Sequence, residues 1–529
     1  MNRLRPSEPE DWRKHPLLLG LLTLFGVQVI ASLWQRFVHD GPLLQYAAYL
    51  IVERHRIPYR DLFDVNLPGT YLFHIFWIKT FGYGDFGFRL LDILWLSAVL
   101  SLLYLILKRF GRIAGLMSVA IAGLIYISDA PRNSLQREWI IALPLLLAVY
   151  LVVEERFRRE IRAFFIGVLF GLVFSIKPHS VILWPLLVIF DATSSESVGF
   201  RAFLRRSAAF GALTLIGFAM VITPIIWWLK AHSAWSPFLD IAKNYYPLYA
   251  SLSGGHELTS GIKRVQMLIN ETLRMGGAAS WVMAAGVGTW LVGTRTTLAR
   301  SDKRIIVLLW AAVGCYLLYT TITGQFWGYH FVLMEIFLCP LAAAMLFHRE
   351  LNITLKKSWF PTMMLLAALF LGPRIPLSTD FIYQVIHRQV KPPKYGRVDE
   401  MSDYLKAHLA PGDAVQPLDW TGGAVHSALI AKADLATSFI WDMPFYHNID
   451  NSYIIGLRKR FINELTASNP RFILQVTAED KPWPYGPNTT RSFFELENFM
   501  LAHYRIARER NGYCIWERIE ASHQDDGRL

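Results

Sequence analysis

The feature that most constrains this chain is a series of long apolar runs separated by short polar segments. The runs lie at 16–35, 87–107, 113–127, 138–153, 163–176, 180–190, 207–229, 278–293, 305–322, 331–347 and 359–373. Because a helix needs about 20 apolar residues to cross a bilayer, several runs must include flanking residues. The sequence therefore predicts a mainly α, polytopic membrane protein with about 11 transmembrane helices.

Composition supports this class and argues against others. Charged residues make up only 18% of the 529 residues, whereas about 25% is typical of soluble domains. Three cysteines cannot form a disulfide scaffold. A disordered chain and an ordinary soluble enzyme are also disfavoured, since 53% of the residues are hydrophobic.

The charges predict how the chain is oriented. Residues 1–374 carry a net charge of +14, and residues 375–529 carry −2. With a cytoplasmic N-terminus, Lys and Arg gather in every inner segment and are few in the short outer loops, as the positive-inside rule requires. We therefore expect a multi-pass protein of the plasma membrane (the bacterial inner membrane) and no nucleic-acid partner. An odd number of spans places residues 375–529 on the extracytoplasmic, or periplasmic, side.

Two domains are expected on this basis. Residues 1–374 form a transmembrane domain with long outer loops at 36–86 and 230–277. Residues 375–529 read as a small extracytoplasmic α/β domain. Its predicted elements are a helix at 397–409 and strands at 414–418, 471–476 and 513–519. Two helices joined by a tight turn are predicted around Lys177-Pro178-His179, which interrupts two apolar runs.

Ionisable and polar side chains gather on the predicted outer boundary, where such groups are costly and often functional. They are His39, Asp40, Asp61, Asp64, Asp129, Arg132, Arg137, Glu138, Lys177, His179, Gln325 and His330. A site built from these loops contains carboxylates that can act as a base and cations that can hold an anion.

Asp40 is the sharpest candidate, because it stands where the first apolar run ends. One interpretation is a general base, partly removed from water at the membrane interface. The other is a side chain that caps the next helix, since Gly41 and Pro42 follow it.

The segment from Arg56 to Tyr71 has the most distinctive sequence in the chain. Two prolines restrict its backbone, and polar residues alternate with aromatic ones. At this depth a non-helical loop must be covered by protein or line a cavity. Candidate substrate-binding residues here are Tyr59, Asp61, Asp64 and Asn66; the alternative is a rigid interfacial turn anchored by Tyr59, Phe63 and Tyr71.

Glu138, directly after Arg137, is either an ion-paired carboxylate at a helix start or a second acidic group of the site. Lys177 is either an interfacial lysine or a phosphate ligand. His330 is better explained by an aromatic interface belt than by metal binding.

His256 precedes Glu257 in the second outer loop, but no further metal motif supports a metal site there. The sequence therefore leaves open whether a divalent metal is required, and it assigns no cofactor. No Walker A or Rossmann fingerprint occurs, which argues against an ATP-driven pump and a nucleotide-sugar enzyme.

Taken together, these motifs resemble the GT-C glycosyltransferases, in particular the branch of the protein O-mannosyltransferases and lipid A aminoarabinose transferases. The features that carry the resemblance are Asp40, Ile57-Pro58-Tyr59-Arg60-Asp61, Asn66-Leu67-Pro68, Lys177-Pro178 and the outer tail. The similarity covers residues 1–190 by motif and the remainder by layout.

The resemblance implies transfer of a sugar from a polyprenyl-phosphate donor to a glycan, lipid or protein acceptor on the outer face, with inversion. Asp40 would be the base, and Glu138 or else Asp129 the second acid. Arg132, Arg137 and Lys177 would hold the donor phosphate. The remaining polar candidates, His179, His256 and His330, would contact substrate.

The chain departs from the family pattern at one place. Relatives often carry a lysine before the proline of the first loop, where this chain has Asn66-Leu67-Pro68. Three other functions stay open: a transporter or flippase of lipid-linked sugars, a ligase that uses a lipid-diphosphate oligosaccharide, and a non-catalytic assembly partner.

Overall fold

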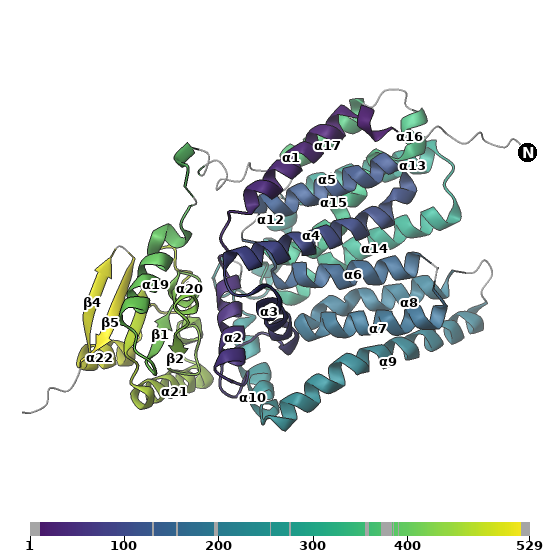
Figure 1. Cartoon of the computed structure of the whole chain (residues 1–529). Coiled ribbons are helices and arrows are strands. Elements are labelled where there is room, and N and C mark those ends of the chain that lie inside the picture. The colour runs from purple at the N-terminus through teal and green to yellow at the C-terminus, as the bar shows by residue number, and fades with distance from the viewer. Residues whose placement is uncertain are drawn as a thin grey trace, which may run out of the picture.

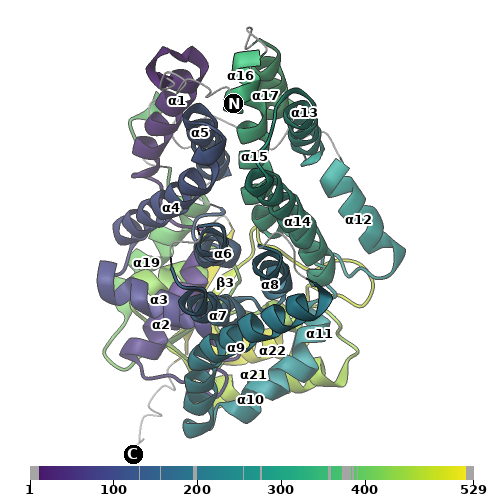
Figure 2. The ribbon, with the colours of Figure 1, turned by 90° about the vertical axis from the view of Figure 1, so that its right-hand side faces the viewer.

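Long helices build most of the chain, and a small sheet with its own helices lies at one end (Figures 1 and 2). The computed structural model describes residues 11–129, 132–154, 157–194, 199–253, 255–273, 277–354, 359–371, 383, 386–389, 391–510 and 512–519. The predicted class, mainly helical with a small sheet, is confirmed.

Each predicted apolar run contains a helix. The long helices are α1 (Pro16–Ser32), α4 (Asp85–Leu107), α5 (Arg112–Asp129), α6 (Arg137–Val153), α7 (Arg159–Ile176), α8 (Trp184–Ala192), α9 (Phe200–Ala231), α13 (Ala279–Arg295), α14 (Arg300–Thr323), α15 (Val332–Leu346) and α17 (Trp359–Leu371). Among the described residues, four helical segments are long and apolar enough to cross a membrane by themselves: Asp85–Phe110, Phe200–Ala231, Arg300–Thr323 and Gly328–Leu351. The total number of spans stays a prediction.

The tight turn predicted after α7 is present. The backbone of Lys177 is extended, with φ −145° and ψ 91°, and Pro178 begins the 3-10 helix η3 (Pro178–Leu183) that leads into α8. Proline fits this first position because it needs no hydrogen-bond partner for an N–H group.

The segments predicted as outer loops contain further helices. They are α2 (Gly41–Glu53), α3 (Pro68–Phe81), α10 (Trp235–Asp240), the π-helix η4 (Ile241–Tyr245), α11 (Tyr246–Tyr249) and α12 (Ile262–Leu273). Short helical pieces complete this part: η1 (Trp12–Lys14), η2 (Lys108–Phe110), η5 (Gly328–Phe331) and α16 (Arg349–Thr354). Residues 36–86 are therefore not a simple loop. Pro42 and Pro68 each stand in the first turn of a helix, where proline is well tolerated.

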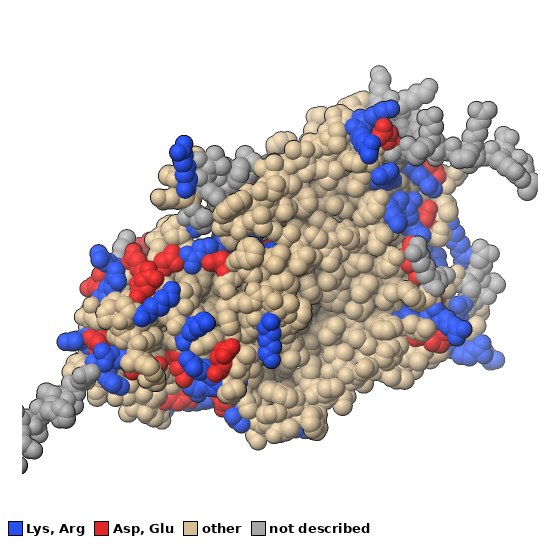
Figure 3. Space-filling model, viewed as in Figure 1, with Lys and Arg blue, Asp and Glu red and all other residues tan. Residues whose placement is uncertain are grey.

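Charges avoid a broad band of the surface. Figure 3 shows one face on which Lys, Arg, Asp and Glu gather over the α/β part and over the opposite ends of the long helices, with an almost uncharged band between. Such a band fits a multi-pass membrane protein.

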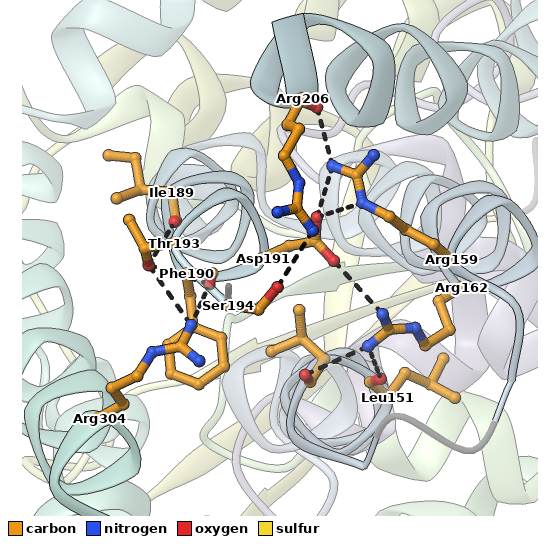
Figure 4. Close-up of polar contacts among 11 residues, drawn as sticks. Leu151, Arg159, Arg162, Ile189, Phe190, Asp191, Thr193, Ser194, Arg206 and Arg304 are labelled. Carbon is orange, nitrogen blue, oxygen red and sulfur yellow. Dashed lines mark hydrogen bonds and ion pairs between the residues drawn. The ribbon is translucent and has the colours of Figure 1, made fainter. Parts of the chain in front are cut away.

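At the helix ends far from the α/β part, Asp191 holds three helices together (Figure 4). Its carboxylate, 3% exposed as a residue, accepts hydrogen bonds from Arg159 Nε at 2.7 Å and from Arg162 Nη2 at 3.4 Å. Arg159 also donates to the carbonyl oxygen of Arg206, at 2.9 Å. These bonds tie α7, α8 and α9 into one unit.

The C-terminal part is an α/β unit. Its elements are η6 (Pro393–Gly396), α19 (Arg397–His408), β1 (Ala414–Leu418), α20 (Ala424–Ile430), β2 (Asp434–Leu435), η7 (Met443–Phe445), α21 (Ser452–Ser468), β3 (Phe472–Val476), α22 (Phe494–His503), β4 (Tyr504–Arg510) and β5 (Tyr513–Arg518). The sheet order is β2-β1-β3-β5-β4, with β1 parallel to β2 and β3, and β5 antiparallel to β3 and β4.

The predicted helix and three predicted strands of this part are present, whereas β2 and β4 were not anticipated. Both are edge strands: β2 has two residues, and β4 is mostly charged and exposed.

The α/β part is fixed to the helices by hydrogen bonds from the first 63 residues. Tyr46 and Tyr49 donate their hydroxyls to the carbonyl oxygens of Ala433 (3.1 Å) and Lys432 (2.6 Å), respectively. The backbone N–H of Phe63 donates to Ser438 O at 2.8 Å. α2 therefore lies directly beside this part, next to α20, as Figure 1 shows.

We predict that Gly167→Ala destabilises the helical part, because a β-carbon at Gly167 would overlap the Thr214 carbonyl oxygen of α9. Overpacking of this kind costs about 1–3 kcal/mol. Thermal unfolding of the purified protein in detergent should show a lower Tm than wild type. Gly167 lies on α7. The matched control is Gly211→Ala on α9, where a β-carbon would meet no atom within 4 Å. Equal Tm values for the two variants would contradict close α7–α9 packing.

Candidate active site

Asp40 lies directly before α2 and is 8% exposed. Although it occupies the N-cap position, its side chain makes no capping hydrogen bond. The capping interpretation is therefore wrong. Instead its Oδ2 lies 3.2 Å from Nη2 of Arg137.

Arg137 begins α6 and joins three segments through one guanidinium. Nη1 donates to Asn66 Oδ1 at 2.5 Å, and Nη2 donates to Asp40 and, at 3.3 Å, to the hydroxyl of Tyr329. Figure 2 shows α6 inside the bundle, between α4 on one side and α8 and α14 on the other. The N-terminal end of this central helix therefore brings together the loop before α3, the start of α2 and η5.

The Arg56–Tyr71 segment is mostly buried, although Arg60 is exposed, and hydrogen bonds to Asp64 hold its central part together. Asn66 Nδ2 donates to the Asp64 oxygens at 3.0 and 2.9 Å, and the Tyr71 hydroxyl donates at 2.8 Å. Burial raises the pKa of Asp64, and the hydrogen bonds from Asn66 and Tyr71 offset this only in part. Tyr59 donates its hydroxyl to Asn66 O at 2.6 Å. Asp64 thus holds Asn66 in place for Arg137.

Glu138, the next residue of α6, is the centre of a second polar group. Its Oε1 lies 3.0 Å from Lys177 Nζ, accepts from the Tyr319 hydroxyl at 2.8 Å, and lies 3.5 Å from His330 Nε2. Glu138 and His330 are both completely buried. His330 also lies 3.2 Å, through Nδ1, from the Thr323 hydroxyl. Its predicted place in an aromatic interface belt is therefore wrong.

Tyr329 lies between the two groups. Its hydroxyl accepts from Arg137, and Lys177 Nζ lies 6.0 Å from the centre of its ring. Two carboxylates and two cations, from residues 40, 137, 138 and 177, thus form one network in which opposite charges alternate. We call these four residues the charge network.

A partly open cavity of about 300 Å³ borders this network. It is lined by Asp40, Leu43, Leu44, Asp64, Val65, Asn66, Arg137, Tyr249, Trp420 and Trp441. Trp420 and Trp441 belong to the α/β part and cover the cavity from outside. On the other side of Trp420, a second cavity of about 260 Å³ is lined in part by His39, Lys394, Thr421 and His426.

An apolar cavity of about 410 Å³ lies on the other side of the start of α6. Its lining residues are Ala122, Ile125, Tyr126, Asn133, Trp139, Val332, Glu335, Ile336 and Cys339. Two of its lining residues are close in sequence to the site: Trp139 follows Glu138, and Val332 is two residues from His330.

His256 lies beside the roof of the site. Its ring contacts those of Trp327 and Trp420, with centroids 4.9 and 5.5 Å apart. Burial lowers the pKa of His256 to about 4, so the side chain is neutral at physiological pH. Among the described residues, no three His, Cys, Asp or Glu side chains are grouped as metal ligands would be.

The other predicted site residues do not join the charge network. Arg132 is exposed, and His179 is half-buried in η3. Asp61 pairs with Arg60 of its own loop at 2.8 Å. Asp129 ends α5, and its side chain lies outside the described residues.

The sequence did not identify the aromatic residues of the site. Tyr249, Tyr319, Tyr329, Trp420 and Trp441 contact the cavity or the charge network, but nothing separates them from the many other aromatic residues of the chain. Trp420 alone had a local signal, since it follows the predicted strand at 414–418 by two residues.

The chain was compared with known protein families, curated proteins and solved structures. Residues 68–227 match the family model of dolichyl-phosphate-mannose-protein mannosyltransferase, a stretch that includes Arg137, Glu138 and Lys177. No curated protein matches the sequence.

Two solved structures of one protein, ArnT, share this fold over nearly the whole chain. ArnT from Cupriavidus metallidurans bound to undecaprenyl phosphate is 11% identical, with a TM-score of 0.59 over 96% of this chain and 99% of ArnT. The apo state of the same protein is also 11% identical, with a TM-score of 0.57 over 95% of this chain and 98% of ArnT. The oligosaccharyltransferase from Archaeoglobus fulgidus, tethered to an acceptor peptide, is 10% identical, with a TM-score of 0.44 over 88% and 70%. The predicted resemblance to the GT-C glycosyltransferases is confirmed.

We predict that Lys177 and Glu138 are strongly coupled. Lys177→Met leaves Glu138 without its closest cation, and removal of one partner of a buried pair costs about 3–5 kcal/mol. Glu138→Gln likewise leaves Lys177 without its carboxylate partner. The double variant should lose less stability than the sum of the two single losses, as measured by denaturant unfolding of all four proteins in detergent. Additive losses would show that the two side chains do not act as a pair.

Proposed function

We propose that the chain is a glycosyltransferase that moves a sugar from a polyprenyl-phosphate donor to an acceptor on the outer face of the membrane. The observation that carries this proposal is Asp40: a carboxylate of the charge network that also lines a cavity roofed by the α/β part. The GT-C fold supports the reaction class, and the ArnT structure holds undecaprenyl phosphate.

Asp40 is the base of the proposed reaction. The acceptor hydroxyl gives its proton to a carboxylate oxygen of Asp40, and its oxygen forms a bond to the anomeric carbon of the sugar. The bond from that carbon to the phosphate oxygen breaks, and its electron pair leaves with the polyprenyl phosphate. A single displacement of this kind inverts the anomeric carbon.

Arg137 and Lys177 stabilise the departing phosphate. Both are buried cations, and positive charge fixed in place where negative charge develops is an effective form of catalysis. Arg137 is fixed by Asn66 and Asp40, and Lys177 by Glu138. Asn66, where relatives often have a lysine, therefore positions a cation rather than supplying one.

The polyprenyl chain needs an apolar channel beside these cations. The cavity between α5, α6 and α15 is the candidate, because it is mostly apolar and is lined by Trp139, which follows Glu138. The acceptor would approach from the opposite side, beneath Trp420 and Trp441. Donor and acceptor would then meet at Asp40.

The test is complementation of a deletion strain with wild type or Asp40→Asn, followed by mass spectrometry of its envelope glycans and lipids. Loss of general-base catalysis lowers rates by about 10²–10⁴-fold, so the modification found with wild type should fall at least 100-fold with Asp40→Asn. Asn keeps the shape of Asp40 but leaves Arg137 without its carboxylate, so some loss of Tm is expected. Product formation is therefore compared per amount of folded protein in the membrane.

The matched control is Asp240→Asn, which changes an exposed outer carboxylate bonded to Asn244 and Tyr453. It should restore the modification fully. Full restoration by Asp40→Asn would contradict the proposal and favour a non-catalytic partner.

A further inference from the structure

The α/β part contains a second, partly open pocket, which the proposed transfer does not use. It is lined by Leu418, Asp442, Tyr446, Gln475, Val476, Lys481, Trp483, Arg491, Phe493, Leu496, Glu497 and Met500. All of these residues come from the α/β part itself. We call it the β1–β3 pocket.

Its position is one that α/β proteins commonly use for ligands. Leu418 and Val476 end the neighbouring parallel strands β1 and β3. From β1 the chain continues through α20 to β2 on one side of the sheet order, and from β3 through α22 to β4 and β5 on the other. A crevice at the carboxyl ends of strands where connections diverge in this way is a typical binding position.

A buried ion pair supplies polar groups to the pocket. Lys481 Nζ donates to Asp442 Oδ2 at 2.5 Å and to Leu418 O at 3.0 Å. Lys481 is 4% exposed and Asp442 is 1% exposed. Asp442 Oδ1 is also buried, and within the described residues it has no hydrogen-bond partner. Because an unpaired buried acceptor is costly, this oxygen calls for a donor from a ligand.

The pocket also has aromatic walls and a polar rim. Lys481 Nζ lies 4.0 Å from the centre of the Trp483 ring, and Tyr446 meets Trp483 edge to face with centroids 4.7 Å apart. Arg491 is exposed and Glu497 is half-buried. With Asp442, the pocket holds two carboxylates and two cations, so it favours a ligand that is uncharged overall and rich in hydrogen-bonding groups.

A nucleotide is disfavoured at this edge of the sheet. In nucleotide-binding α/β folds, phosphate binds at the start of the helix after the first strand. Here the N–H groups of Gly422, Gly423 and Ala424 all donate to the carboxylate of Asp419, at 2.8 Å each. Asp419 therefore takes the place of a phosphate.

We propose that the β1–β3 pocket binds one monosaccharide unit. A sugar hydroxyl would donate to Asp442 Oδ1, other hydroxyls would accept from Lys481 and Arg491, and the C–H face of the sugar would pack against the aromatic wall. The lining suits a single sugar ring, which carries hydroxyls for the polar groups and a C–H face for the aromatic wall.

The pocket adjoins the proposed active site through the backbone. Asp442 follows Trp441, and its N–H donates to Asp419 O at 3.2 Å, next to Trp420. Trp420 and Trp441 are the two side chains that roof the Asp40 cavity. A sugar held in the pocket would therefore fix the roof of the cavity, although the sugar binding itself does not depend on the proposed transfer.

The test is saturation-transfer NMR on the full-length protein in nanodiscs with free glucose, galactose, mannose and N-acetylglucosamine. We expect at least one sugar to bind with a Kd of about 1 mM. Trp483→Leu and Glu497→Gln should weaken that binding at least 10-fold. Both residues lie at least partly exposed, so both variants should fold even if Asp442→Asn does not.

The matched control is Glu495→Gln, on the same helix as Glu497 but outside the pocket, which should bind as wild type does. Asp40→Asn should also bind normally, so a failure of the transfer proposal leaves this result intact. The same measurement is made with the free amino acids glycine and alanine. The proposal is overturned if no sugar of the panel binds or if one of these amino acids binds in the pocket instead. It is also overturned if Asp40→Asn, rather than Glu497→Gln, removes sugar binding.

Discussion

The architecture depends on the burial of four charges where the helices meet the α/β part. Each ion removed from water costs several kcal/mol unless an opposite charge and hydrogen bonds compensate for it. Asp40 and Arg137, and Glu138 and Lys177, meet this requirement in pairs. The start of α2, the start of α6 and the turn after α7 therefore have to come together, although they are far apart in the sequence.

The α/β part completes this environment by keeping water away. Arg36 pairs with Asp399 of α19 at 2.7 Å, which adds an ion pair to the backbone bonds that fix the two parts. Trp420 and Trp441 then cover Asp40 and Arg137. Removal of water strengthens every electrostatic interaction beneath the cover, so the two parts of the chain make one site.

The sequence predicted the helices well because a membrane imposes a strong, local requirement on composition. It also identified Asp40, Arg137, Glu138 and Lys177, since charges at the edge of apolar runs are rare and need a reason. What it missed depends on contacts between distant segments. A helix after Asp40 was considered only as the one that Asp40 would cap, and α3 was treated as loop, because both helices are shorter than a membrane span. Trp441 acquires its role only when the α/β part docks. His330 was misplaced for the same reason: its burial comes from α6 and α14, not from its neighbours in sequence.

The two acidic residues of the charge network are not equivalent, and this difference supports the roles proposed for them. Glu138 is completely buried, and its Oε1 is bound by Lys177 and Tyr319. It does not line the cavity beneath the tryptophans, whereas Asp40 does. A base must lie within hydrogen-bond reach of the proton that it removes. Asp40 therefore suits proton transfer with an acceptor in that cavity, and Glu138 suits the positioning of Lys177.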